Sequence, residues 1–336
     1  MITGYDVGAL LYCPANARNH IVDALVRERY PRPFSLAFCL EDTVRDDGVE
    51  EAERELFHTF EQISRALKEN KFYLPLIFVR VRSPEQMRKL AAKFGAFSDF
   101  LTGFILPKFF IENCGAYIRT IQDIKASDGL SFRYMPIFES ASMIDLRWRY
   151  THLFEVKDHL EAVSDQILNI RVGGNDLSHA FGLRRHVTDT IYDIRPVSDL
   201  LTDIVTAFAT RYVVSGPVWE YYAGSGWEEG LRREMELDLL CGFVGKTVIH
   251  PNQIPVVNDC LRVSAADYRD ACDILNWDPA NPRLVSSSAQ LTRMNEYNTH
   301  TRWADRMLRL AQVYGVKSDL DGKQSKNADL QGGVTL

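Results

Sequence analysis

The stretch ILNIRVGGND, residues 167–176, contains the pattern from which the fold can be inferred. A short run rich in β-forming residues is followed by two glycines and a polar turn, which is typical of a strand in a parallel sheet. Similar runs recur along the chain, each followed by a polar turn and then a longer stretch. The eight runs are Ala9–Cys13, Ser35–Leu40, Leu74–Val81, Gly103–Leu106, Tyr134–Phe138, Ile167–Val172, Tyr212–Val214 and Lys246–Ile249.

The stretches between the runs are long enough for crossover helices. Those with helical periodicity include Glu50–Asn70, Ser83–Phe97, Asn113–Asp128, Asp199–Thr210 and Trp227–Leu240. Eight βα units predict an α/β fold of the closed (β/α)₈ TIM-barrel type rather than an open doubly wound sheet. The first run ends in CPANAR, residues 13–18, and lacks the GxGxxG fingerprint of a dinucleotide-binding fold.

The C-terminal part of the sequence predicts an appended helical segment. Ala265–Leu275 and Ala289–Tyr314 have helical periodicity, and the proline-containing stretch WDPANPR lies between them. We therefore expect a TIM-barrel catalytic domain over residues 1–262 and a helical extension over residues 263–316 that packs on the barrel or on a neighbouring subunit. Residues 317–336 are too polar to order themselves and predict a flexible tail.

Composition excludes several classes of protein. The 336 residues carry a formal net charge of −6, which argues against nucleic acid as a partner, because such proteins usually have a basic excess. No segment reaches the roughly 18 consecutive apolar residues of a membrane span, and the N-terminus has no signal-peptide pattern. The six cysteines contain no CxxC pair, as is typical of reduced thiols. We expect a cytoplasmic protein with no membrane association.

Polar residues at the carboxyl ends of the strands are the candidates for chemistry, because TIM-barrel active sites lie there. Glu41 and Asp42 follow the second run, although Asp42 could simply cap a helix. Arg80 and Arg82 alternate in the third run and so are predicted to share one side, either the barrel interior or the helix layer. A guanidinium in the interior suits bidentate binding of a carboxylate. Lys108, after the fourth run, could bind a substrate anion or pair with the rim carboxylates.

Glu139 and Asp176 end the fifth and sixth runs and are the predicted metal ligands. Neighbouring parallel strands lie about 4.8 Å apart, so two carboxylates at matching heights can share one ion. A hard cation such as Mg²⁺ accepts one or two carboxylates plus waters and substrate oxygens. Either acid alone could be a helix cap, but the glycines at 173 and 174 favour metal binding, because they allow close approach of the backbone. We expect Gly174 and Asn175 to contact the substrate.

Other catalytic arrangements have little support in the sequence. His250 follows the eighth run and is read as a structural residue, although a role as general base stays open. The chain has no GxSxG nucleophile motif and no HExxH metal motif.

In this order, the motifs resemble the citrate lyase β-subunit-like branch of the HpcH/HpaI aldolase superfamily. LLYCPANARN resembles the family's LFVPG element, VGGNDLSHAFG its FGxxDLxxxxG element, and GFVGKTVIHPNQIPVVN its GFDGKxxIHPxQIxxVN element. CLEDTV, FVRVRS, LPK, PIFES and VSGPVWEYY match five further family motifs. The chain also resembles a divergent subgroup, the C–C bond lyases of the TIM-barrel fold.

The resemblance implies Mg²⁺, or Mn²⁺ in its place, held by Glu139 and Asp176. It further implies that Arg80 clamps the carboxylate of an oxo-acid, with Asp42 and Glu41 at the metal and its water shell. The implied enzyme makes or breaks a carbon–carbon bond in a small-molecule carboxylate or an acyl-CoA thioester, such as a citryl- or malyl-type compound. Whether coenzyme A is bound stays open. The resemblance also implies a homo-oligomer, with a trimer favoured.

The sequence departs from the family pattern at Gly8, Ala15, Cys39 and Arg82. The last three lie near the rim and leave the substrate open, and an extra cation at Arg82 would suit a more anionic substrate. Two alternatives therefore stand beside the lyase: a thioesterase acting on a malyl-type thioester, and a non-catalytic protein that binds a metal and an oxo-acid. The general base stays open among His250, Glu41, a metal-bound water and a residue of a neighbouring subunit.

Overall fold

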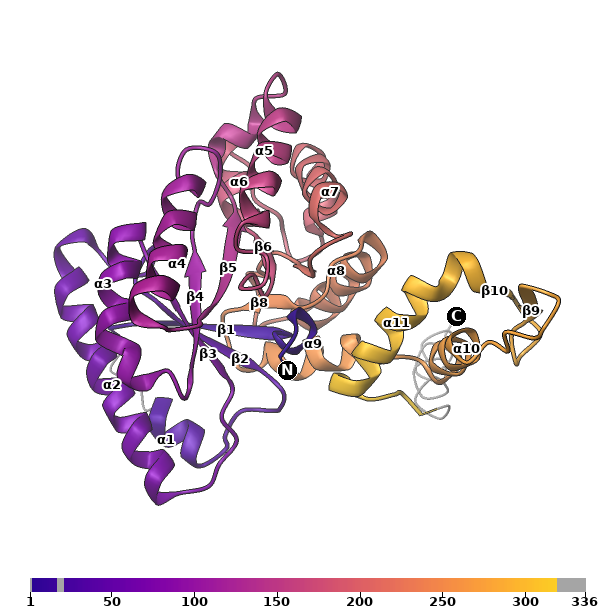
Figure 1. Ribbon diagram of the computed structural model, residues 1–336, viewed down its shortest axis with the longest axis horizontal. Coiled ribbons are helices and arrows are strands. Elements are labelled where there is room, and N and C mark those ends of the chain that lie inside the picture. The colour runs from indigo at the N-terminus through magenta and orange to yellow at the C-terminus, as the bar shows by residue number, and fades with distance from the viewer. Residues whose placement is uncertain (1, 17–20, 319–336) are drawn as a thin grey trace, which may run out of the picture. The chain divides into compact units, whose positions relative to one another are not determined.

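The computed structural model describes residues 2–16 and 21–318, so most of the predicted tail lies outside the described residues. The chain divides into two compact units, Met1–Cys260 and Leu261–Leu336. Within the described residues, eight parallel strands of the first unit form one sheet in the order β7-β6-β5-β4-β3-β2-β1-β8 (Figure 1). An isolated parallel bridge between Gly216 and Lys246 joins the two edges, which closes the barrel. The predicted TIM barrel is confirmed.

All eight predicted strands are present, most of them with slightly different ends. They are β1 (Ala9–Pro14), β2 (Ser35–Cys39), β3 (Leu76–Arg80), β4 (Leu101–Leu106), β5 (Arg133–Phe138), β6 (Ile170–Val172), β7 (Val214–Ser215) and β8 (Lys246–Val248). The α-helices of this unit are α1 (Ile21–Val26), α2 (Val49–Glu69), α3 (Pro84–Phe94), α4 (Cys114–Asp128), α5 (Arg149–Glu161), α6 (Gly174–Ala180), α7 (Arg195–Phe208), α8 (Trp227–Cys241) and α9 (Gln253–Leu261). Short 3₁₀ helices are η1 (Gly4–Asp6), η2 (Asp46–Gly48), η3 (Gly95–Phe97), η4 (Ala141–Ile144) and η5 (Ile191–Asp193). No helix among the described residues is long and apolar enough to cross a membrane.

Local sequence explains where the helices form and which face they bury. Ser83 caps α3, because its hydroxyl accepts a hydrogen bond from the backbone amide of Gln86, and Pro84 occupies the first turn, where no amide is needed. In α2 the buried side chains recur at helical spacing, and Phe60 from this stripe contacts Phe38 of β2 and Phe94 of α3. One layer of the core therefore lies between the sheet and the surrounding helices.

A second hydrophobic layer fills the barrel interior. Its members come from strands β1 to β5 and from residues that precede β1 and β6, and they are almost fully buried: Val7, Leu10, Ala37, Phe78, Ile105, Met135, Ile137 and Leu168. This layer closes the lower part of the barrel, so a site for chemistry is left at the carboxyl ends of the strands.

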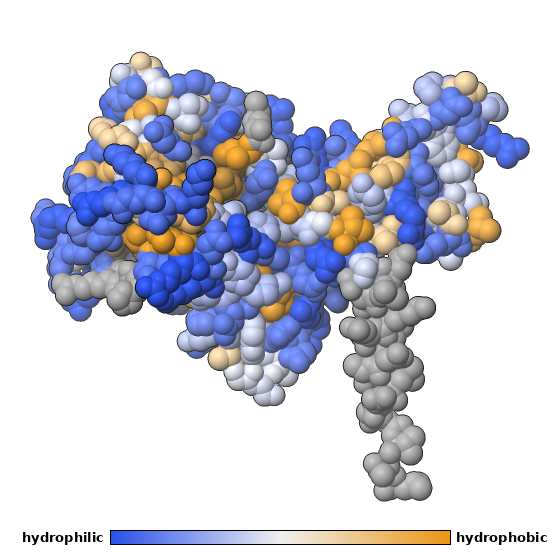
Figure 2. All heavy atoms as spheres, turned by 90° about the horizontal axis from the view of Figure 1, so that it is seen from below, coloured by the Kyte–Doolittle hydropathy of each residue, from blue (hydrophilic) through white to orange (hydrophobic). Residues whose placement is uncertain are grey.

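The second unit differs from its prediction in one respect. Its elements are α10 (Ala265–Leu275), β9 (Val285–Ser287), β10 (Met294–Glu296) and α11 (Tyr297–Tyr314). The predicted helix Ala289–Tyr314 is thus wrong over its first eight residues, because Met294–Glu296 pair in antiparallel fashion with Val285–Ser287. In the space-filling view most of the visible surface is hydrophilic, and hydrophobic residues form small separate patches (Figure 2).

Candidate active site

Arg80, the last residue of β3, is the centre of a buried ion cluster at the barrel rim. Its Nη2 atom lies 2.7 Å from Glu41 Oε2, 2.9 Å from Asp42 Oδ2 and 2.9 Å from Glu139 Oε1. The predicted interior position of Arg80 is therefore observed, with the anionic partners that a buried guanidinium requires. Its Nε atom is buried and, in the described part of the chain, has no hydrogen-bond partner.

Lys108 completes the cluster from the loop after β4. Its ammonium group forms ion pairs with Glu41 and Asp42, and its backbone amide donates to Glu139 Oε1 at 3.0 Å. The residue has a φ of +48°, a left-handed conformation that a lysine adopts only at a cost in free energy. Of the two interpretations of Lys108, pairing with the rim carboxylates is the one observed.

The two adjacent acids respond differently to this cluster. Burial raises the pKa of Glu41, and Arg80 and Lys108 only partly offset that effect. Burial acts in the same direction on Asp42, but the charges of Arg80 and Lys108 outweigh it and leave the pKa of Asp42 below its ordinary value. Asp42 therefore remains an anion, while Glu41 accepts a proton more readily.

Glu139, directly after β5, has one oxygen committed to the cluster and one directed elsewhere. Oε1 accepts from Arg80 and from the Lys108 amide, whereas Oε2 faces Gly173. A Cβ atom at position 173 would lie 2.2 Å from Oε2, so only glycine leaves room for the carboxylate. Burial raises the pKa of Glu139 to about 7; Arg80 opposes this shift, and the negative charge of Asp176 adds to it.

Asp176 lies in the first turn of α6, which begins directly after Gly173. It is partly exposed, and no ion pair holds its carboxylate among the described residues. Its negative charge contributes to the raised pKa of Glu139, so the two predicted ligands interact electrostatically. Gly174 is also needed for packing, because a Cβ atom there would lie 2.7 Å from Pro217 Cβ.

Arg82 lies apart from the Arg80 cluster. β3 ends at Arg80, so the two-residue alternation of a strand no longer sets the direction of the Arg82 side chain. Its guanidinium donates to the carbonyl oxygens of Leu40 (3.2 Å) and Val44 (2.9 Å) and pairs with Asp46. In the structure, Arg82 stabilises the loop after β2, and the shared orientation expected for the two arginines is not observed.

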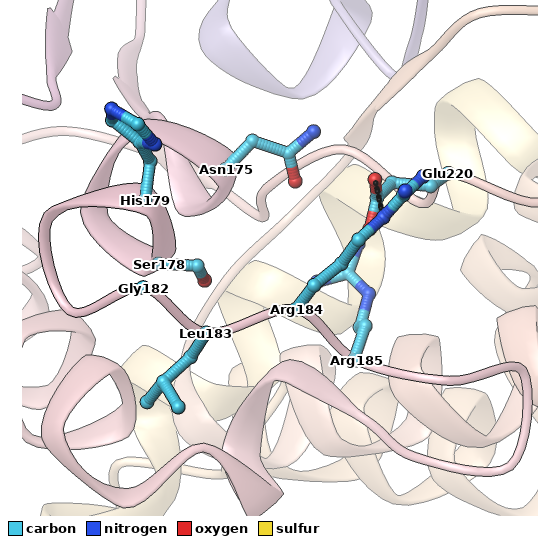
Figure 3. Close-up of a pocket in the computed structure, with 8 residues that line it drawn as sticks. All are labelled: Asn175, Ser178, His179, Gly182, Leu183, Arg184, Arg185 and Glu220. Atoms are coloured by element: carbon cyan, nitrogen blue, oxygen red, sulfur yellow. Dashed lines mark hydrogen bonds and ion pairs between the residues drawn. The ribbon is translucent and has the colours of Figure 1, made fainter.

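Asn175, the residue before Asp176, lines a pocket of about 350 Å³ (Figure 3). Asn175 extends toward Arg184 and Glu220, whose side chains form an ion pair at 3.2 Å (Figure 3). Asn175 could be predicted from the sequence, but Arg184 and Glu220 could not, because they lie in loops where no periodicity marks them. The full lining is Asn175, Ser178, His179, Gly182, Leu183, Arg184, Arg185 and Glu220.

The motif around β8 is structural at most of its positions. Lys246 points away from the interior and lies fully buried against Glu234 (2.9 Å) and Asp238 (2.6 Å) of α8. Gln253 donates to the carbonyl oxygens of residues 219 and 221 and accepts from the amides of residues 249 and 250. His250 stacks on Tyr222 at a centroid distance of 4.7 Å, and its Nδ1 accepts from the amide of residue 252, in keeping with a structural role.

Comparisons with known proteins agree with this fold. Among solved structures, the CitE protein of Mycobacterium tuberculosis in complex with magnesium, acetoacetate and coenzyme A is similar, with 20% identity and a TM-score of 0.61 over 91% of this chain and 98% of that chain. RipC of Yersinia pestis has 16% identity and a TM-score of 0.54 over 79% and 100%. A citrate lyase beta subunit from M. tuberculosis, complexed with oxaloacetate and magnesium, has 19% identity and a TM-score of 0.50 over 77% and 99%.

These identities establish likeness of fold, while the family is established by sequence. No protein with a curated description matches the chain. The family model described as C–C bond lyase of the TIM-barrel fold matches residues 1–316. The chain therefore belongs to the family of carbon–carbon bond lyases of the TIM-barrel fold, as the order of its motifs predicted.

Proposed function

We propose that this protein is a Mg²⁺-dependent lyase that makes or breaks a carbon–carbon bond beside the carboxylate of an oxo-acid. The observation that carries the proposal is the arrangement of Glu139. One of its oxygens is held by Arg80 and Lys108, and the other is directed past Gly173 toward the segment that bears Asp176. Magnesium and oxo-acids are bound in the similar structures from M. tuberculosis, which supports this choice of cofactor and substrate class.

The donor set fits a magnesium ion. Among the described residues, no group of three or more His, Cys, Asp and Glu side chains is arranged to hold a metal. Mg²⁺ does not need such a group, because it usually keeps several waters and binds through one or two carboxylates plus substrate oxygens. Glu139 Oε2 and the carboxylate of Asp176 supply two such ligands. Bound there, the ion would stabilise negative charge on the oxygens of an enolate or alkoxide.

The remaining residues of the cluster hold and orient the substrate. Arg80 supplies the positive charge beside which the carboxylate of the oxo-acid binds, and Glu41 and Asp42 fix the guanidinium in place. Lys108 balances the charge of these two acids and, through its amide, fixes the Glu139 carboxylate. The rest of the substrate extends into the pocket that begins at Asn175.

Metal-dependent enolisation tests this function without knowledge of the full substrate. The purified protein is incubated in D₂O with pyruvate, with and without Mg²⁺, and exchange of the methyl protons is followed by NMR. We expect exchange that requires Mg²⁺ and that falls by about 100-fold or more in E139Q, since the charge that holds the ion is removed.

The matched control is E53Q, which makes the same change at another buried acid. Glu53 lies on α2 and binds Lys89 and Gln86, outside the rim cluster. The E53Q variant should leave the Mg²⁺-dependent exchange of the methyl protons unchanged. Exchange that proceeds without Mg²⁺, or no exchange by the wild type with any small oxo-acid, would contradict the proposed function.

A further inference from the structure

One buried cation of the barrel differs from all the others. Among the described residues, five buried cationic side chains are Arg80, Arg149, Arg171, Arg185 and Lys246. Four of them have a carboxylate partner: Arg80 has three, and the others pair with Asp203, Glu234 or Asp238. Arg171, which is 1% exposed, has none in the described ranges. Since an uncompensated buried charge is costly, this position requires an explanation.

Neutral groups surround Arg171. Its Nη2 donates to Thr247 Oγ1 of β8 at 2.7 Å, and its Nη1 lies 3.4 Å from Asn169 Oδ1. The Tyr12 phenol of β1 lies beside the same guanidinium, and burial lowers the pKa of Arg171 without an opposing carboxylate. A guanidinium only donates hydrogen bonds, so it occupies a lone pair of the Thr247 hydroxyl and leaves the hydroxyl proton free for another acceptor.

These side chains lie directly beneath the rim cluster. Arg171 precedes Gly173 by two residues and is paired in register with Ile137, two residues before Glu139. The Arg80 guanidinium lies 5.9 Å from the centroid of the Tyr12 ring, so Tyr12 joins the two arginines. Tyr12 and Thr247 are only partly buried, and the register partners of Thr247 and Arg171, Leu10 and Ile137, belong to the hydrophobic layer of the interior. Tyr12 therefore lies between Arg171 and the Arg80 cluster at the rim.

We propose that Arg171 is a specificity-determining positioning residue, which acts through the hydroxyl groups of Thr247 and Tyr12 to favour a substrate with a second anionic group. The proposal rests on the proposed function. The charge of Arg80 is already balanced by three carboxylates. Arg171 is thus the buried cation of the described residues whose charge no carboxylate balances, and it would take the role of the extra cation that the sequence suggested for Arg82.

Binding of two stable hydroxy acids that differ by one carboxylate tests this inference. L-Malate and L-lactate are titrated by calorimetry into the wild type, R171M, R171K and T247V in the presence of Mg²⁺. We expect the wild type to prefer malate by at least about tenfold, R171M to lose this preference with little change for lactate, and R171K to restore part of it. T247V should reduce the preference while it leaves the guanidinium in place.

Two outcomes would overturn the inference. One is a wild type that binds both acids equally or binds neither; the other is an R171M variant that loses affinity for both by the same factor. Titration of Mg²⁺ alone separates this failure from a failure of the proposed function. Mg²⁺ binding without a preference for malate contradicts only the role of Arg171, whereas absence of Mg²⁺ binding contradicts the metal site itself.

Thermal unfolding without ligand distinguishes a functional role from a structural one. R149M leaves its partly buried partner Asp203 without a counter-ion, and it should lower the melting temperature. R171M leaves no carboxylate unpaired, so its melting temperature should equal or exceed that of the wild type. If R171M lowered the melting temperature as much as R149M does, Arg171 would be needed for stability, and this result would contradict the inference.

Discussion

Gly173 is the residue on which the geometry of the proposed metal site depends most directly. G173A places a methyl group 2.2 Å from Glu139 Oε2, so the carboxylate has to move away from its present position. We expect Mg²⁺ affinity, measured by calorimetry, to fall by at least about tenfold. In G115A, the new methyl group meets only the tip of Arg119 at 3.4 Å, so this control should bind Mg²⁺ normally. Equal affinity in G173A and wild type would contradict the assignment.

The raised pKa of Glu139 predicts how the metal-free protein responds to pH. Burial raises its pKa from 4.5 to about 7, so between these values the folded state holds a proton that the unfolded state releases. The contribution of this group to stability is therefore present below about pH 4.5 and is lost as the pH rises to 7. Urea unfolding in EDTA should show this loss in the wild type and not in E139Q. If the free energy of unfolding depended on pH in the same way in both proteins, this would contradict the raised pKa of Glu139.

Side-chain identity at strand ends could be predicted from the sequence, but side-chain direction could not. Glu139 follows its apolar run directly and Asp176 follows its run after three residues, and this position alone marks them as rim residues. Arg82 seemed equivalent to Arg80 only because the strand was expected to continue beyond residue 80. Arg171 received no role, since a single cation within an apolar run carries no signal of whether it faces the interior or the helices.

At the scale of elements, a buried ion cluster joins β8 to α8. Lys246 is fully buried between Glu234 and Asp238, and Tyr192 of η5 donates to Asp238 at 2.7 Å. K246M would leave the buried Asp238 without a cationic partner and Glu234 with only the longer contact to Arg185, and it should lower the free energy of unfolding by about 3–5 kcal/mol. K125M removes an exposed lysine paired with Asp165 and should cost less than about 1 kcal/mol. Urea denaturation measures both, and equal losses would contradict a structural role for this cluster.

The hairpin of the second unit shows where elements could not be predicted. Leu291, Met294 and Tyr297 recur at helical spacing, so the pattern continues through residues that in fact form β10. The pairing of β10 with β9 is a contact between separate segments, which periodicity within one segment does not reveal. The eight barrel strands were predictable because each is short, apolar and bounded by polar turns.

At the scale of the whole molecule, the fold could be predicted from the order of the eight βα units, and no single unit would have been enough. Closure of the barrel brings residues 41, 80, 108 and 139 to one rim, although they are far apart in the sequence. The predicted homo-oligomer stays a prediction, since it depends on surfaces between copies of the chain.

Metal binding should stabilise the whole molecule. An ion that binds only the folded state adds about 2.7 kcal/mol at a concentration 100 times its dissociation constant. We expect the melting temperature of the wild type to rise with Mg²⁺ concentration and that of D176N to stay constant. An equal rise in both proteins would place the bound ion elsewhere.

The most direct test of the account is a crystal structure of the protein grown with Mn²⁺ in place of Mg²⁺ and measured for anomalous scattering. The account predicts one strong peak at the carboxyl ends of the strands, bound by Glu139 Oε2 and Asp176, with Arg80 still beside Glu139. A peak at another position, or side chains of Glu139 and Asp176 that do not share one ion, would contradict it.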